Sequence, residues 1–193
     1  MTFKNLYEYV LGLNEIPIVL ESRIVPKLQQ LTGQDEILFV PVELDTGISY
    51  GHIKQYRRPG IPYSESKWVT EIRYEKNFNI CWKRFICCKE LMHLFDTAAE
   101  RADSAAKLNR LLSELESPPP YAEASEMYKS ETNTQWMALG VLCPIPLRER
   151  YRAEWAAKKI TDYDVALQLR IPEAVVQSLM SPYFEAFIGS LVK

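Results

Sequence analysis

Three residues near the middle of the chain, Lys89, Glu90 and His93, have types and spacing that could perform chemistry together. On an α-helix Lys89 and His93 are about 40° apart and Glu90 is about 100° from Lys89, so all three can face one cleft. A glutamate there can act as a general base and a histidine can bind a metal ion. The plainer interpretation is a Lys–Glu pair and a structural histidine on an ordinary amphipathic helix.

The string Lys89 to His93 matches the zinc-peptidase motif His-Glu-x-x-His at its second and fifth places. In that motif both histidines hold Zn²⁺ and the glutamate polarises the metal-bound water. Lys89 takes the place of the first histidine, and an ammonium group has no lone pair for a metal. To become a ligand it would have to titrate near pH 7, a fall in pKa of roughly 3 units or about 4–5 kcal/mol. The string therefore indicates descent from such an enzyme and argues against its activity.

Composition favours a cytoplasmic protein without a membrane partner. The chain has 193 residues, a formal net charge of -2 and 47% hydrophobic residues, enough for a packed core and no reason to expect a polyanionic partner. Its four cysteines include no Cys-x-x-Cys pair, which favours a reducing compartment. Charged residues interrupt the apolar stretch of residues 1–20, so we expect no signal peptide. The longest uncharged run, residues 132–147, is too short and too polar to span a bilayer.

Helices and strands follow one another in four sections. Apolar spacing predicts helices over residues 3–11 and 22–33, the second with Ser22 as N-cap and Gly33 after its end. Strands are predicted over residues 36–44, 49–57 and 68–74, with a hairpin turn at 45–47 and a longer loop at 58–62. Further helices are predicted over residues 79–99 and 102–115, then up to Pro144, with several short ones behind it. Three prolines at 118–120 interrupt this section. Their simpler interpretation is a spacer between helices, and the alternative is a polyproline ligand.

The segment around Lys89 resembles the ImmA/IrrE family of zinc endopeptidases, whose members commonly read Arg-Phe-x-x-Ala-His-Glu-Leu-x-His. In this chain Cys88 stands in the place of the alanine and Lys89 in the place of the first histidine. The matching residues are Arg84, Phe85, Glu90, Leu91 and His93.

A second family pattern, Glu-x-x-Ala-Asn-x-Phe-Ala-x-x-Leu-Leu-x-Pro, is similar to residues 131–144, and its leading glutamate is the family's third zinc ligand. Glu131, Ala138, Leu142 and Pro144 match outright, while Thr134, Gln135, Met137 and Val141 are close substitutions. The resemblance covers roughly residues 36–181. It implies an α+β, zincin-like fold in which a small three-stranded antiparallel sheet packs on the motif-bearing helix, between mostly helical N- and C-terminal sections. It also implies a domain over residues 1–144 with a helical extension over 145–193 packed on it.

Carried over residue by residue, the resemblance implies Glu90 as general base and His93 and Glu131 as metal ligands, if a metal is bound. Two ligands do not make a catalytic zinc site. Three ways to complete the set remain open. Cys88 could turn in as a thiolate, although it lies about 140° from His93 on a helix. His52 could approach from the sheet, or Asp96 could join Glu90, His93 and Glu131 in a site for iron or manganese.

The preferred hypothesis is that Lys89 replaces the metal, because its ammonium group would balance the carboxylates of Glu90, Glu131 and Asp96 in a partly dry cleft. We then expect no cofactor, with zinc bound only if the site is functional. The function implied is an inactive (pseudo) metallopeptidase that acts as a regulatory or protein-binding module. Its partner by resemblance is a helix-turn-helix repressor, in a phage or mobile-element setting. The alternative is an active metal-dependent endopeptidase with an altered ligand set that cleaves a transcriptional repressor.

The tail offers a rival class, because residues 161–180 read as two short helices joined as in a helix-turn-helix. Five apolar residues would fill the angle between them: Ala166, Leu169, Ile171, Val175 and Leu179. The second helix has no Lys or Arg between Glu173 and Met180 to contact phosphates or bases. The sequence therefore argues against DNA as a partner, and a small packing module is the plainer interpretation.

Overall fold

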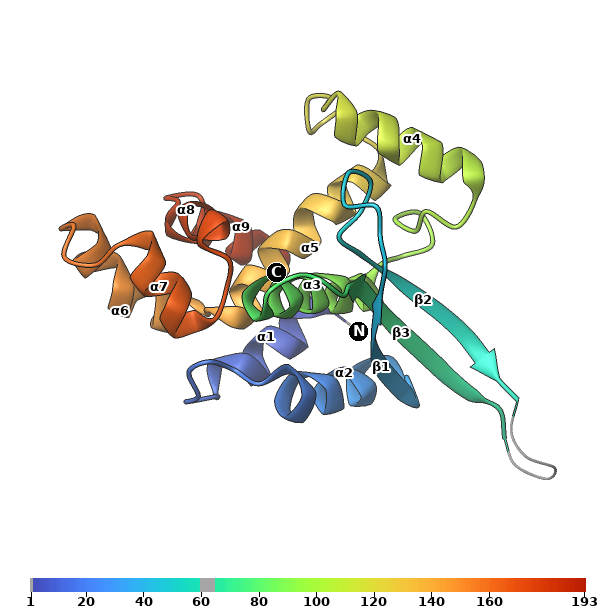
Figure 1. Cartoon of the computed structure of the whole chain (residues 1–193), viewed down its shortest axis with the longest axis horizontal. Coiled ribbons are helices and arrows are strands. Elements are labelled where there is room, and N and C mark those ends of the chain that lie inside the picture. The colour runs from blue at the N-terminus through green and yellow to red at the C-terminus, as the bar shows by residue number, and fades with distance from the viewer. Residues whose placement is uncertain (1, 60–64) are drawn as a thin grey trace.

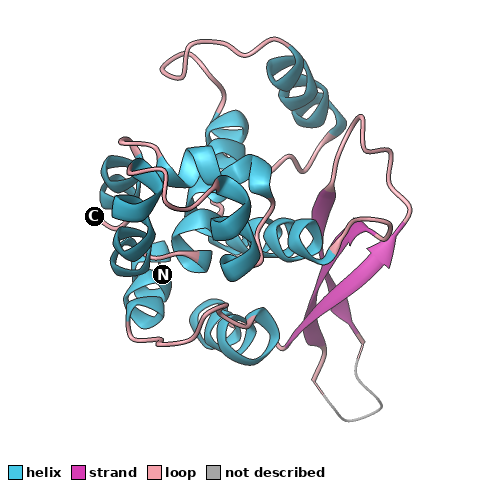
Figure 2. Cartoon of the chain, turned by 60° about the vertical axis from the view of Figure 1, so that its left-hand side comes forward, coloured by secondary structure: helices cyan, strands magenta, loops and turns pink. Residues whose placement is uncertain are grey.

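The computed structural model describes residues 2–59 and 65–193. Helix α3 (Ile80–Met92) lies at the centre, with the sheet on one side and the other helices around it (Figure 1). Figure 2 shows that helices and strands gather on opposite sides of the molecule. The predicted α+β class is confirmed.

The sheet has three strands, β1 (Glu36–Val42), β2 (Gly51–Arg58) and β3 (Lys67–Glu75), in the order β1-β3-β2. Strand β2 is antiparallel to β3, but β1 is parallel to it. The prediction of an antiparallel sheet was therefore wrong, and so was the hairpin at residues 45–47, since β1 and β2 are not neighbours. The predicted loop at residues 58–62 runs into positions 60–64, which lie outside the described residues.

Glu75, at the end of β3, holds the loop that carries the chain from one edge of the sheet to the other. Its buried carboxylate accepts hydrogen bonds from the backbone N–H of Leu44 at 2.6 Å and of Asn77 at 2.9 Å. Its own N–H donates to the carbonyl of Tyr50 at 3.1 Å. A turn does form at Asp45, which accepts from the N–H of Gly47. That turn belongs to a loop that passes the end of β3, and its local sequence does not reveal where the loop leads.

The N-terminal section contributes α1 (Phe3–Leu11) and α2 (Val25–Thr32). Helix α1 buries Phe3, Leu6, Tyr7 and Val10, the spacing of a single helical stripe. A π-helical turn (Leu20–Ile24) precedes α2, so Ser22 is not the predicted N-cap. Gly33 ends α2 with φ 70, as a residue without Cβ readily does.

Helix α3 and its neighbour α5 (Glu126–Leu142) carry most of the candidate residues. Asn79 caps α3 by accepting from the N–H of Trp82 at 3.0 Å. The helix ends at Met92 and tightens into a 3-10 turn (His93–Phe95), so the predicted helix over 79–99 is too long. Strand β2 approaches α3 closely at Gly51, where an added Cβ would lie 2.6 Å from Ile86.

Helix α4 (Ala105–Glu116) stands apart from the body of the molecule, as both views show (Figures 1 and 2). The hydroxyl groups of Ser104 and Ser125 cap the starts of α4 and α5. The three prolines that follow α4 lie in the connection between α4 and α5.

The C-terminal section forms α6 (Ile145–Ala156), α7 (Asp162–Leu169), a 3-10 turn (Glu173–Val175), α8 (Val176–Met180) and α9 (Phe184–Leu191). The guanidinium of Arg148, fully buried, donates to the carbonyls of Leu179 at 2.7 Å and Ser181 at 2.9 Å and so fixes the turn between α8 and α9. Ile188 of α9 packs against Gly140 of α5. None of the helices within residues 2–59 and 65–193 is both long enough and apolar enough to cross a membrane.

Candidate functional site

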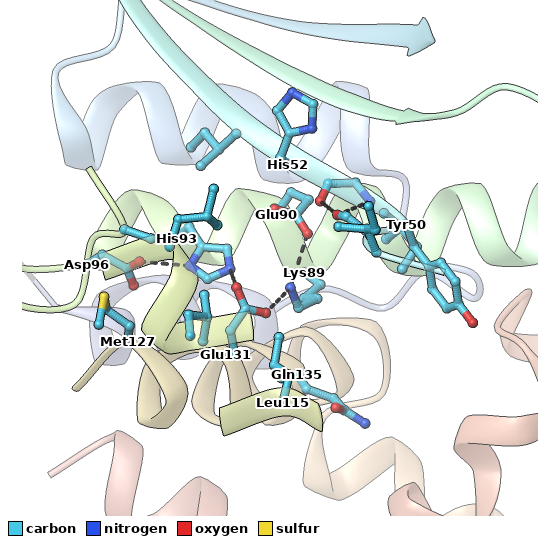
Figure 3. A pocket seen from close by; sticks show the side chains of 18 of the residues that line it. Tyr50, His52, Lys89, Glu90, His93, Asp96, Leu115, Met127, Glu131 and Gln135 are labelled. Atoms are coloured by element: carbon cyan, nitrogen blue, oxygen red, sulfur yellow. Dashed lines mark hydrogen bonds and ion pairs between the residues drawn. The ribbon is translucent and has the colours of Figure 1, made fainter. Parts of the chain in front are cut away.

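The candidate residues line a cleft with a volume of about 950 Å³ between the sheet and helices α3, α4 and α5. One wall is β2 with the loop before it, the floor is α3, and α4 and α5 close the other side (Figure 3). Of the residues singled out from the sequence, the cleft is lined by His52, Lys89, Glu90, His93, Asp96 and Glu131.

Five charged side chains form one continuous chain of contacts in this cleft (Figure 3). The ammonium group of Lys89 lies 3.1 Å from Glu90 Oε1 and 2.5 Å from Glu131 Oε2. The other oxygen of Glu131 lies 3.4 Å from His93 Nε2. The Nδ1 atom of the same ring lies 2.7 Å from Asp96 Oδ2. Anionic and cationic groups therefore alternate along the whole chain.

Burial and these contacts together set the charge of the central pair. Burial by itself would lower the pKa of Lys89, but the carboxylates of Glu90 and Glu131 outweigh it and raise that pKa above its usual value. Burial would raise the pKa of Glu131, but Lys89 and His93 hold it well below its usual range. Lys89 is therefore a cation and Glu131 an anion at neutral pH. A charged Lys89 cannot serve as an amine nucleophile or as a ligand.

His93 is also held in its charged form. Burial favours the neutral ring, but hydrogen bonds to Asp96 and Glu131 prevail and raise its pKa to about 9. Ser130 adds to this arrangement, because its hydroxyl donates to Asp96 Oδ1 at 2.7 Å. The same hydroxyl lies 3.4 Å from His93 Nδ1, the nitrogen that already contacts Asp96. A nucleophilic serine needs the opposite ring nitrogen as its base, so this trio is not a hydrolase triad.

The donor set in this arrangement does not fit a divalent metal ion. A histidine ligand must offer a lone pair from a neutral ring, whereas both ring nitrogens of His93 face carboxylate oxygens as donors. Lys89 and protonated His93 together carry two positive charges, the charge that Zn²⁺ would bring to the same carboxylates. Within the described parts of the chain, no group of three or more His, Cys, Asp or Glu side chains is arranged to hold a metal.

The three candidates for an additional metal ligand, Cys88, His52 and Asp96, lie in different surroundings. Cys88 is fully buried, with its thiol 3.9 Å from the carbonyl of Ala138 on α5, and burial raises its pKa to about 12. A thiolate there is strongly disfavoured. His52 projects from β2 on the far side of Glu90 from Glu131 (Figure 3). Asp96 contacts His93 and Ser130 as a hydrogen-bond acceptor instead of facing Glu90.

Two parts of this site, Ser130 and the leucines of α4, were not predicted from the sequence. Ser130 directly precedes Glu131, but nothing in the sequence connects it with Asp96, since the 3-10 turn that brings them together is not encoded by a recognisable signal. The cleft is also lined by apolar residues of α4 whose helical spacing is visible in the sequence, although that spacing does not show that they face a cleft: Leu108, Leu111, Leu112 and Leu115.

Comparisons of the chain with models of protein families, with curated proteins and with solved structures give no match. The resemblance to ImmA/IrrE endopeptidases stays a prediction from two sequence motifs; in the structure His93 Nε2 lies 3.4 Å from Glu131.

The charged state of His93 predicts a pH-dependent stability. Its pKa is raised from an unfolded value near 6.5 to about 9, so its contribution is fully present below about pH 6.5 and is lost as pH rises through 9. Between pH 6.5 and 8.5 we expect the free energy of unfolding to fall by about 2 kcal/mol. Urea unfolding across this range measures the slope. His93→Gln should remove the slope and His52→Gln should keep it, whereas an equal slope in both variants would assign it to other groups.

Proposed function

We propose that this protein is a non-catalytic relative of the ImmA/IrrE endopeptidases, with a zincin-like fold, that acts as a regulatory protein-binding module. The observation that carries the proposal is the position of Lys89, in contact with Glu90 and Glu131, the residues that would be the general base and a metal ligand in an active relative. An ammonium group between these carboxylates stabilises the folded cleft without a metal. It also leaves no water activated for hydrolysis.

The open edge of β2 supports the binding of an extended protein segment. Within residues 2–59 and 65–193, β2 pairs with β3 on one side and with no strand on the other. The hydroxyl of Ser49 donates to the carbonyl of Gly51 at 2.6 Å and accepts from the N–H of Gly51 at 3.3 Å. The backbone N–H and carbonyl of Gly51 therefore point away from β3. In an antiparallel strand every second residue points its backbone groups to the same side. The backbone groups of Ile53 and Gln55 therefore also point away from β3, and both residues line the cleft. An added strand would pair there.

The partner that the resemblance implies is a helix-turn-helix repressor, as expected from the sequence. A repressor would be held by an extended segment in the cleft and would not be cut. The C-terminal helices give no support to direct DNA binding by this chain, because α8 spans only Val176–Met180 and has no basic residue.

A displayed library of random peptides tests this function without knowledge of the partner. Peptides enriched on the wild type should slow hydrogen–deuterium exchange in β2. They should also remain intact by mass spectrometry after incubation with and without zinc. N-methylation at alternate peptide positions should abolish binding in one register and spare it in the other, because strand pairing uses every second N–H.

Two outcomes would contradict the proposal. One is cleavage of an enriched peptide by the wild type in the presence of zinc, lost on replacing Glu90 by Gln. The other is the absence of any peptide that protects β2 from exchange.

A further inference from the structure

Helix α4 presents an unusual apolar surface to the cleft. We define the leucine stripe as Leu108, Leu111, Leu112 and Leu115, all of which line the cleft. The side chains of Leu108 and Leu115 are each 46% exposed, although a stripe with this spacing is normally buried against a core. Only Leu111 is buried among the residues of α4. The stripe therefore faces space that the rest of the described chain does not fill.

Polar contacts hold α4 in this position at both ends. Near its start, the ammonium group of Lys107 donates to the carbonyls of Ala98 and Arg101, both at 3.1 Å. Near its end, the carboxylate of Glu114 accepts hydrogen bonds from the hydroxyl and the N–H of Ser125. The stripe is thus presented to the cleft by a helix with fixed ends.

Aromatic side chains of α3 and of the loop before β2 also line the cleft and are called the aromatic wall: Tyr50, Trp82 and Phe85. The rings of Tyr50 and Trp82 meet edge to face with centroids 5.6 Å apart, and Trp82 meets Phe85 in the same way at 6.3 Å. Ile48, on the loop before β2, is 63% exposed and also lines the cleft. A side chain that contacts the aromatic wall or the leucine stripe would exchange water for apolar surroundings.

The charge of the cleft adds a second selective feature. Its lining holds five acidic side chains, Glu90, Asp96, Glu100, Asp103 and Glu131, against Lys89 and Arg101, with His93 as a further cation. Lys107 of α4 pairs with Asp103 at 2.9 Å, so the acidic groups outnumber the basic ones by one. The net charge is therefore negative, and a segment with positive charge is attracted to it.

We propose that the leucine stripe and the aromatic wall of the same cleft select an extended protein segment that combines bulky apolar side chains with basic residues. The inference rests on the proposed function and specifies the chemistry of the partner. An extended chain suits the site because the stripe lines a cleft whose other wall is an edge of β2 that pairs with no strand within residues 2–59 and 65–193. A second copy of this protein would have to offer a similarly narrow segment.

Binding of the enriched peptides to variants of α4 tests the inference. Leu108→Ser with Leu115→Ser should weaken the affinity for the peptides by roughly 10- to 100-fold, because both exposed leucines lose their apolar contacts. Leu11→Ser with Leu167→Ser is the matched control, since these helical leucines are 44% and 61% exposed and do not line the cleft. A peptide with its leucine or phenylalanine replaced by serine should show the same loss on the wild type, which keeps the test independent of variant folding.

The outcomes separate the inference from the proposed function. Peptides that protect β2 from exchange but show no apolar or basic preference, or bind both double variants equally, overturn the inference alone. Failure to enrich any peptide overturns both. Self-association of the wild type that the α4 double variant abolishes would identify a second copy as the occupant and overturn the inference.

Discussion

Lys89→Ala is expected to lower the free energy of unfolding by about 3–5 kcal/mol, because removal of one partner from a buried ion pair leaves the other charge uncompensated. The side chain of Glu90 is 4% exposed and that of Glu131 is 26% exposed, so solvent replaces little of the lost attraction. Urea unfolding at pH 7 measures the loss. Lys76→Ala is the matched control, since its pair with Glu43 is exposed and should contribute at most about 1 kcal/mol.

The charge can be separated from the packing of the lysine stem. Lys89→Met keeps most of the aliphatic volume, so it should lose nearly as much stability as Lys89→Ala if charge dominates. Adding Glu90→Gln to Lys89→Ala should recover part of the loss, since it removes the carboxylate whose ion-pair partner is Lys89, whereas Glu131 keeps its contact with His93. If Lys89→Ala is no more harmful than Lys76→Ala, the ammonium group does not balance the cleft.

The second large effect is expected when the first histidine of the zinc-peptidase motif is introduced at position 89. Lys89→His should create a two-histidine, one-glutamate donor set with His93 and Glu131, and Zn²⁺ should then bind the folded state preferentially. At a free zinc concentration of roughly 100 times the dissociation constant, the gain is about 2.7 kcal/mol. For a chain of this size that corresponds to a rise in Tm of roughly 5–10 °C. Thermal melts with and without zinc measure it.

Lys89→Gln is the control for this experiment, because it removes the ammonium group without adding a strong ligand. Its melting temperature should not respond to zinc, and neither should that of the wild type. Zinc binding to Lys89→His should also release protons, since His93 must become neutral to act as a ligand. If wild type and Lys89→His respond alike, Lys89 does not stand in the place of a metal.

The sequence predicted which side chains lie close together better than it predicted the sheet, for physical reasons. The spacing of Lys89, Glu90 and His93 fixes their common direction once a helix forms, and the matching pattern around Glu131 places the carboxylate on a second helix. The sheet order instead involves contacts between residues far apart in the chain, such as the hydrogen bond from the N–H of Leu44 in the crossing loop to the carboxylate of Glu75, 31 positions later. No local periodicity encodes such contacts.

The charged state of His93 was also beyond the sequence. Asp96 lies three residues further on, but it reaches the ring because the helix tightens after Met92. The leucine stripe was visible as helical spacing, yet that spacing normally predicts burial, and it cannot show that the stripe faces a cleft.

In the proposed function, Lys89 and protonated His93 occupy the electrostatic place of a metal ion. Elemental analysis of the wild type, purified without chelator, tests it most directly. We expect well under one equivalent of zinc per chain, and close to one equivalent for Lys89→His purified in the same way. One zinc per wild-type chain, lost in His93→Ala and in Glu131→Gln together with peptidase activity, would contradict the account.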